Sequence, residues 1–247
     1  MKFAHSRVDL PSEDLASGRV LFSRPGLTAF PVRLASELFL RATSLLLRVG
    51  RPPPYHLYDP TCGGGYFATV VGFLHGDMLR NVSMSDISAD AVSVAAKNAA
   101  LLTRKGLSLR LGELNALVNL YDRPSHRAAL FSGSQLFALC RHLSPNVFKA
   151  DVTDAALVGS KLTLLPPVDL VMADVPYGKR EYWWSGSNQA ALMASLASIN
   201  VPVVVLATAK AMKFDHPGFE RSGKYHHGHR TLWLFRNSDF AIDPTKS

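Results

Sequence analysis

Two short segments of the chain combine side chains that can bind a nucleotide-like ligand and present a planar group to it. The first is Asp59-Pro-Thr-Cys-Gly-Gly-Gly-Tyr66, in which Gly63, Gly65 and the following Ala68 fit the pattern G-x-G-x-x-G/A. The second is Asp174-Val-Pro-Tyr-Gly178, which joins a hydrogen-bond acceptor, a rigid bend and an aromatic face. Their order along the chain is that of a cofactor loop followed by a substrate motif.

The glycine segment lies between a predicted strand and a predicted helix, and Asp86 follows it by about 20 residues. Glycines let the backbone approach a ligand, and Asp86 can accept hydrogen bonds from ribose hydroxyls. Asp59 places a carboxylate beside the loop, which suits a cation better than the pyrophosphate of a dinucleotide. S-adenosylmethionine carries an ammonium and a sulfonium group, so we expect Asp59 to bind its amino group, with NAD as the alternative.

Three other features have competing interpretations. Asp151 ends a predicted strand, where its carboxylate suits either an adenine amino group or the cap of the next helix. Cys62 lies within the cofactor loop, so we interpret it as a small buried residue and not as a nucleophile. The histidines of 226–229 have no companion cysteine or carboxylate at a recognised spacing, so the sequence predicts no metal site.

The second motif narrows the group on which the chain acts. N–H groups of a base can donate to Asp174 and to the carbonyl of Val175, while Tyr177 stacks on the base plane. Methyl transfer from a sulfonium requires alignment and a free lone pair on the acceptor, which positioning supplies. Arg180 and Trp183 follow directly and are candidates for clamping the target nucleotide, although Trp183 could equally cover the core.

The elements that must position these motifs alternate along the chain. The predicted strands are 55–59, 82–86, 147–151, 168–174, 203–207 and 231–236, and the predicted helices are 31–48, 66–79, 88–102, 154–158 and 189–199. This alternation predicts an α/β fold with a mainly parallel sheet, helices on both faces, and ligands beyond the carboxyl ends of the strands. We expect one domain over 1–247, with an N-terminal helical segment at 1–50 and a helical insertion at 103–146.

Composition limits the partners. Lys and Arg outnumber Asp and Glu by 27 to 19, a formal charge of +8 that suits a polyanion such as nucleic acid. A modestly basic chain that binds no charged partner fits the same composition equally well. The basic and aromatic residues of 210–230 fit RNA contacts or a solvated hairpin equally well. Two distant cysteines and no long apolar run predict a cytoplasmic protein without disulfides or membrane contact. No sequence feature indicates an obligate protein partner.

Five segments resemble the AviRa-type family of avilamycin-resistance methyltransferases, and the resemblance runs from about Val8 to Ala207. They are 15–21, 29–35, 59–66, 95–102 and 174–178. The resemblance implies a Rossmann-like class I methyltransferase fold with a seven-stranded sheet and an antiparallel C-terminal strand. It also implies methylation of guanine N1 in 23S ribosomal RNA of the large subunit or its precursor, with resistance to orthosomycin antibiotics. The glycine loop departs from the family only at the small residues Thr61 and Gly64.

With this resemblance the candidate residues fall into three groups. The catalytic candidates are Asp174, Pro176 and Tyr177, with Asp174 either accepting the N1 proton or holding the neighbouring amino group. The candidates for substrate binding are Tyr177, Gly178, Arg180 and Trp183. The candidates for cofactor binding are Phe30, Arg33, Asp59, Thr61, Cys62, Gly63, Gly65, Asp86, Ile87, Asp151, Val152 and Asp174. The alternatives are methylation of adenine, guanine N2 or protein glutamine, an RNA-binding module without catalysis, and an NAD-linked oxidoreductase.

Overall fold

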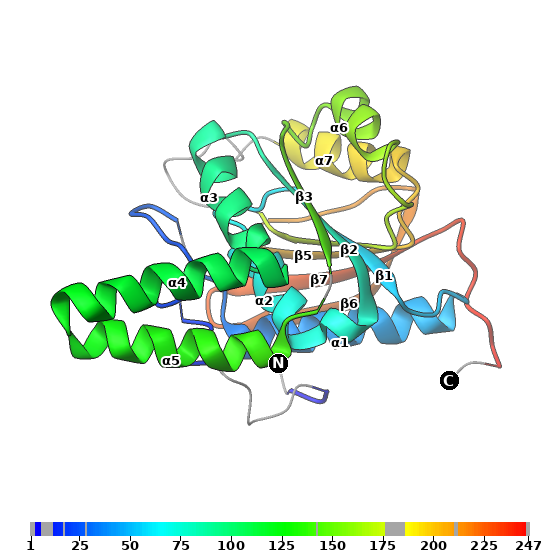
Figure 1. Cartoon of the computed structure of the whole chain (residues 1–247). Coiled ribbons are helices and arrows are strands. Elements are labelled where there is room, and N and C mark those ends of the chain that lie inside the picture. The colour runs from blue at the N-terminus through cyan, green and yellow to red at the C-terminus, as the bar shows by residue number, and fades with distance from the viewer. Residues whose placement is uncertain are drawn as a thin grey trace.

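The structure is a computed structural model that describes residues 3–5, 12–16, 18–27, 29–141, 143–175, 186–209 and 212–245. Its seven strands form one sheet in the order β3-β2-β1-β4-β5-β7-β6 (Figure 1). The strands are β1 Tyr55–Asp59, β2 Leu79–Asp86, β3 Ser144–Lys149, β4 Leu170–Asp174, β5 Val203–Ala209, β6 Phe219–His227 and β7 Arg230–Asn237. The first five in this order pair in parallel, whereas β7 is antiparallel to both β5 and β6. The predicted mainly parallel sheet with an antiparallel C-terminal strand is confirmed.

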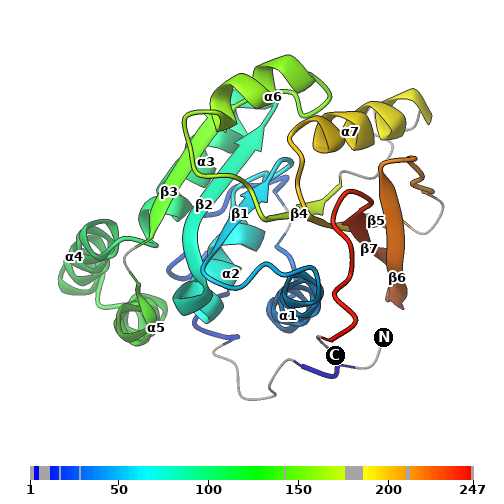
Figure 2. The same ribbon diagram turned by 90° about the vertical axis from the view of Figure 1, so that its right-hand side faces the viewer.

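Helices cover both faces of the sheet (Figure 2). They are α1 Val32–Arg48, α2 Tyr66–His75, α3 Ala89–Ala100, α4 Arg104–Tyr121, α5 Pro124–Leu139, α6 Ala155–Leu162 and α7 Gly186–Ser198, and a 3-10 turn spans Gly76–Met78. Side chains of α1, α2 and α3 share one apolar core with one face of β1 and β2. Those of α6 and α7 share a second core with the opposite face. No helix within the described ranges is long and apolar enough to span a membrane.

Two strands begin three residues before their predicted starts. The 3-10 turn ends α2 at His75, so β2 begins at Leu79, three residues before the predicted start, and Leu79 pairs with Tyr55. The β3 strand also begins earlier, at Ser144, and includes Pro145. Proline removes a ladder donor, but β3 lies at the edge of the sheet, where that donor is not needed. Because β3 ends at Lys149, Asp151 lies beyond the strand and does not end it.

The C-terminal region contains a strand that the sequence did not predict as one. Only Phe219 of β6 is buried, and its remaining side chains are exposed or half-buried, without the apolar alternation of a core strand. Its hydrogen bonds to β7 form a hairpin at the end of the sheet. Residues 219–237 therefore form a hairpin whose β6 side chains are mostly exposed or half-buried.

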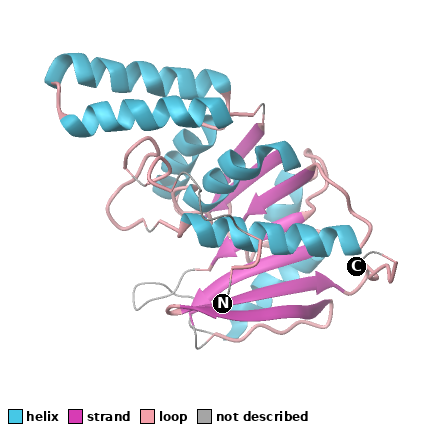
Figure 3. Ribbon diagram, turned by 90° about the horizontal axis from the view of Figure 1, so that it is seen from below, coloured by secondary structure: helices cyan, strands magenta, loops and turns pink. Residues whose placement is uncertain are grey.

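The predicted insertion forms two antiparallel helices. The α4 and α5 helices are joined by a tight turn at Asp122, whose backbone is left-handed with φ 44°. They lie next to the β3 edge and project away from the sheet as a hairpin (Figures 1 and 3).

Candidate functional site

The loop after β1 is shaped by short backbone contacts. The Cys62 N–H donates to the Ser85 carbonyl at 2.9 Å, which holds the loop against the end of β2. Gly65 has a left-handed backbone with φ 73°, and a Cβ there would lie 2.9 Å from the Met84 sulfur. Both the conformation and the close contact require glycine, and α2 begins at the next residue. The loop therefore presents backbone where side chains would otherwise stand.

Asp86 connects this loop to the start of the next helix. One carboxylate oxygen accepts from the Gly63 N–H and the other from the Ser88 N–H, both at 2.9 Å. The Ser88 hydroxyl in turn caps α3 by accepting from the Ala91 N–H at 3.3 Å. Each carboxylate oxygen has two lone pairs, so Asp86 keeps acceptor capacity for a ligand hydroxyl.

A cavity of about 510 Å³ opens above the loop. The predicted cofactor residues that line it are Phe30, Asp59, Thr61, Cys62, Gly63, Asp86, Ile87 and Asp174. The predicted residues Arg33, Gly65, Asp151 and Val152 are not among its lining residues. The predicted residues Pro176, Tyr177, Gly178, Arg180 and Trp183 lie outside the described residues. The cavity also has lining residues that the sequence did not indicate, namely Arg24, Pro25, Gly26 and Leu27.

Asp59 lies at the base of this cavity in a setting that disfavours its negative charge. Its side chain is 1% exposed, and it accepts from the Thr61 N–H at 3.3 Å. Burial raises the pKa of Asp59 well above its ordinary value, and the nearby carboxylates of Asp174 and Asp86 raise it further. A fourth lining carboxylate, that of Asp90, pairs with Arg24. The three carboxylates of Asp59, Asp86 and Asp174 favour a ligand that brings positive charge, and an α-ammonium or a sulfonium group fits this donor set.

Asp174 has a cationic partner, Arg230, which the sequence indicated only as one of the basic residues of 210–230. The Arg230 guanidinium donates to both Asp174 carboxylate oxygens, at 3.5 and 3.4 Å. Burial raises the pKa of Asp174, and the charge of Arg230 opposes that rise. The guanidinium also lies over the Phe30 ring, 5.1 Å from its centroid, and Phe30 stacks on Phe67. Arg230 thus joins the base of the cavity to its aromatic wall.

The outer wall of the cavity is held by a buried amide. The Asn98 side chain accepts from the Phe22 N–H at 2.7 Å and donates to the Phe22 carbonyl at 2.9 Å. It also donates to the Gly64 carbonyl at 2.7 Å. Asn98 therefore ties segment 22–27 to the glycine loop, although the two are far apart in the sequence. In the sequence, the only indication of this role was that Asn98 lies in 95–102, one of the segments that resemble the family.

The remaining candidates have structural surroundings of their own. Asp151 accepts from the Thr153 N–H and hydroxyl at 2.9 and 2.7 Å, while Asp154 is the residue that caps α6. Val152 is buried in the core on the α6 side of the sheet. The Arg33 guanidinium lies 4.3 Å from the centroid of the Phe3 ring.

Two chemistries are disfavoured by the site. Burial raises the pKa of the Cys62 thiol well above its ordinary value, so Cys62 is a poor nucleophile, as expected from its position. Among the residues that the structure describes, no group of three His, Cys, Asp or Glu side chains could hold a metal ion.

Comparison with known proteins agrees with this geometry. The sequence model of the family described as rRNA methyltransferase AviRa matches residues 1–230. A 23S rRNA (guanine(2535)-N(1))-methyltransferase of Streptomyces viridochromogenes is 36% identical over 245 residues, which cover 96% of each chain. Two solved structures of rRNA methyltransferase AviRa from that organism are 33% identical and have TM-scores of 0.85 and 0.84, covering 97% of this chain and 98% of theirs. The chain has their Rossmann-like methyltransferase fold and belongs to the AviRa family of rRNA methyltransferases.

Proposed function

We propose that this protein transfers a methyl group from S-adenosylmethionine to N1 of a guanine in 23S ribosomal RNA. The observation that carries the proposal is the acidic cavity at the ends of β1, β2 and β4, in a chain whose relative is named for this reaction. An oxidoreductase is ruled out by the family, and the three cavity carboxylates argue against a module that has lost catalysis.

S-adenosylmethionine supplies an electrophilic methyl group on a sulfonium. In our proposal the Asp59 carboxylate binds its α-ammonium, which neutralises a buried negative charge. Asp86 accepts from the ribose hydroxyls with its remaining lone pairs, and Asp151 accepts from the adenine amino group. Phe30 and Ile87 provide apolar cover at the cavity wall.

The acceptor base is read by a carboxylate and a guanidinium that lie side by side. Guanine presents two donors, N1–H and the N2 amino group, next to the O6 acceptor. Asp174 accepts from the donors, and Arg230 donates to O6, where negative charge develops as the N1 proton leaves. Adenine has an acceptor at N1 and a donor at N6, so this pair selects guanine. Asp174 either takes the proton itself or holds the base while water takes it.

The other candidate residues are also part of the proposal. Tyr177 stacks on the target base beside Pro176 and Gly178, and Arg180 and Trp183 hold the flanking RNA. The whole chain, 1–247, acts as one domain in the cytoplasm, where ribosomal RNA of the large subunit is met.

The test is methyl transfer from labelled S-adenosylmethionine to unmodified 23S rRNA, transfer RNA, DNA and ribosomal proteins. We expect label in 23S rRNA alone, and mass spectrometry of the digested RNA should identify 1-methylguanosine. Label in protein alone, or a methyl group at guanine N2 or adenine, would contradict the proposal. Expression in a sensitive bacterium should raise the inhibitory concentration of an orthosomycin, which tests the proposed resistance.

A further inference from the structure

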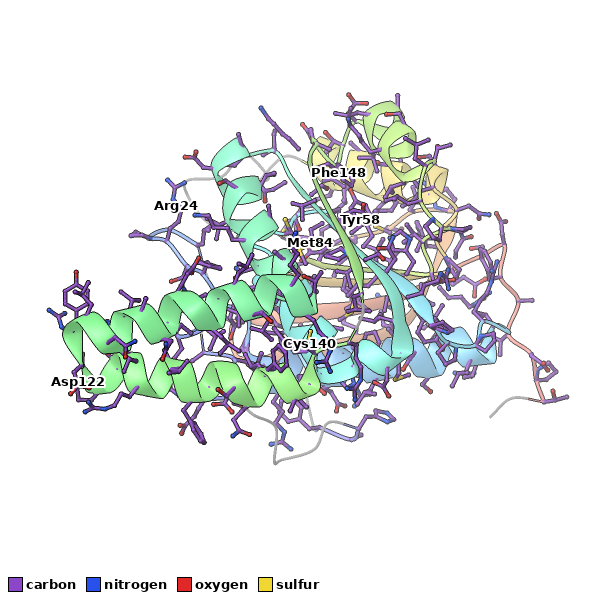
Figure 4. All side chains as sticks on the ribbon, viewed as in Figure 1. Arg24, Tyr58, Met84, Asp122, Cys140 and Phe148 are labelled. Atoms are coloured by element: carbon purple, nitrogen blue, oxygen red, sulfur yellow. The ribbon has the colours of Figure 1, made fainter. Side chains whose placement is uncertain are left out.

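The α4–α5 hairpin contributes little to the core of the protein. Its buried residues are Leu107, Leu114, Ala129, Ser132, Gly133 and Leu136. None of the fourteen positions from 115 to 128 is buried. The outer half of the hairpin, with Asp122 at its tip, stands clear of the sheet (Figures 1 and 4). Packing within the fold therefore does not explain why the outer half is present.

The hairpin concentrates positive charge. Residues 104–141 carry six Lys or Arg side chains and two acidic ones, so they hold half of the formal net charge of +8. At the tip, Arg123 and Arg127 are both exposed, and Arg127 pairs with Asp122. A basic projection of this kind fits a polyanion.

An aromatic side chain stands among these charges. Tyr121 is 54% exposed at the end of α4. The Arg123 guanidinium lies 5.7 Å from the centroid of its ring, and the centroid of the His126 ring lies 5.9 Å from it in an edge-on arrangement. Exposed rings beside arginines are surfaces on which unpaired bases stack while the arginines bind phosphates, whereas a neutral or basic protein surface would gain nothing from the excess of positive charge.

The base of the hairpin is fixed to the wall of the cofactor cavity. Arg110 of α4 donates to the Val20 carbonyl at 3.1 Å, and its guanidinium lies 4.3 Å from the centroid of the Phe22 ring. The backbone of Phe22 is held by Asn98, and Arg24, two residues further on, lines the cavity. The tip therefore stands at a defined position relative to the bound target nucleotide.

We propose that the α4–α5 hairpin is an RNA-binding arm that contacts ribosomal RNA flanking the target guanine. Arg123 and Arg127 bind phosphates, and Tyr121 stacks on an unpaired base. The 18 residues of α4 give the arm a reach of about 27 Å, so it binds RNA away from the reacting base. This inference rests on the proposed function and adds a second RNA-binding surface to it.

The test compares three double variants in methyl transfer to a fragment of 23S rRNA. Arg123→Glu with Arg127→Glu should raise KM for the RNA about tenfold with little change in kcat. The slope of log affinity against log salt concentration should fall by the amount that corresponds to about one to two phosphate contacts. Arg123→Lys with Arg127→Lys should keep the wild-type KM because the charges remain. Arg48→Glu with Lys161→Glu changes the net charge equally at exposed positions in the last turns of α1 and α6, and should leave KM nearly unchanged.

A second variant tests the aromatic contact. Tyr121→Ala should raise KM for the RNA about tenfold while leaving the salt dependence as in the wild type, because stacking releases no counterions. Affinity for S-adenosylmethionine and the unfolding temperature, measured on each variant, identify any that fail to fold.

Three outcomes would overturn the arm. An unchanged KM for RNA in folded tip variants would contradict the proposed RNA-binding arm. An equal rise in KM in the matched control, Arg48→Glu with Lys161→Glu, would contradict it too. If the tip variants methylated intact large subunits poorly but naked RNA normally, the tip would bind a ribosomal protein and not RNA. Failure of the wild type to methylate any RNA would instead contradict the proposed function, while direct RNA binding by the wild type and the tip variants still tests the arm.

Discussion

At the scale of single residues, the site combines carboxylates that the fold disfavours in their charged form. Asp59 is buried next to two other carboxylates, and its pKa is raised well above the ordinary value. A folded pKa above the unfolded one means that the stability due to Asp59 is present at acidic pH and is lost as pH rises through the folded pKa. At neutral pH the unliganded protein therefore carries a destabilising group, and a cationic ligand relieves this cost.

This predicts opposite effects of Asp59→Asn on stability and on binding. Asparagine keeps the shape and the acceptor for the Thr61 N–H but lacks the charge. Denaturant unfolding at pH 7 should show a variant at least as stable as the wild type, while calorimetry should show S-adenosylmethionine affinity reduced about tenfold or more. The exposed Asp215→Asn serves as control and should change neither quantity. Unaltered cofactor affinity in Asp59→Asn would remove Asp59 from the binding site.

The ion pair between Arg230 and Asp174 predicts that replacing Arg230 changes the pH dependence of methyl transfer. Burial raises the pKa of Asp174, the positive charge of Arg230 lowers it, and Asp174 in turn raises the pKa of Asp59. Without Arg230 the pKa of Asp174 rises further, so more of it is protonated at neutral pH. The acid limb of kcat/KM against pH should move up by about one unit or more in Arg230→Met and much less in Arg230→Lys. Superimposable profiles for wild type and Arg230→Met would show that Arg230 does not tune Asp174.

At the scale of elements, the cavity depends on α3 holding two loops together. Asn98 makes three hydrogen bonds, two to Phe22 and one to Gly64, and its side chain is fully buried. The contact joins the wall of the cavity to the glycine loop across α3. A helix that packs against the sheet thereby also sets the width of the cofactor site.

Replacing this amide should weaken both the fold and cofactor binding. Asn98→Ala leaves three buried or half-buried backbone groups without their partner, and we expect a loss of about 2–4 kcal/mol in the free energy of unfolding. The Kd for S-adenosylmethionine should rise as well, because segment 22–27 loses its attachment. Asn119→Ala, at an exposed position of α4, should stay within about 0.5 kcal/mol of the wild type. Equal effects of the two substitutions in urea titrations would contradict the assigned role of Asn98.

At the scale of the whole molecule, the protein keeps two histidines neutral inside the fold. Burial lowers the pKa of His56 and lowers that of His75 to about 4. His56 hydrogen-bonds to the Ser83 hydroxyl at 2.8 Å, and His75 to the Ser36 hydroxyl at 3.0 Å. Since their folded pKa values lie below the unfolded ones, the stability that they contribute is present above about pH 6.5 and is lost as pH falls through the folded pKa, which for His75 is about 4.

The fold should therefore weaken under mild acid before most carboxylates titrate. His75 alone accounts for about 3 kcal/mol between pH 7 and pH 4. Denaturant titrations at several pH values should show this loss in the wild type and a smaller one in His75→Gln, whereas the exposed His229→Gln should behave as the wild type does. A pH dependence that His75→Gln leaves intact would assign the acid sensitivity elsewhere.

The sequence by itself determined most elements and the residues at their ends. Periodicity located α1 and β1 to within a residue, and the glycine spacing with Asp86 predicted a loop that the structure places at the cavity. These features are local, because a helix or a strand end is set by neighbours within a few residues. The β6 strand escaped prediction because an exposed edge strand needs no apolar alternation.

Only the tertiary structure decided which distant residues meet. Arg230 lies 56 residues from Asp174, and they are neighbours because β7 inserts antiparallel beside β5, which itself lies next to β4. Phe22 lies 76 residues from Asn98 and meets it where the N-terminal segment crosses α3. The order of strands in the sheet and the path of the N-terminal segment follow from burying both faces of the sheet at once. No spacing along the chain encodes that global packing.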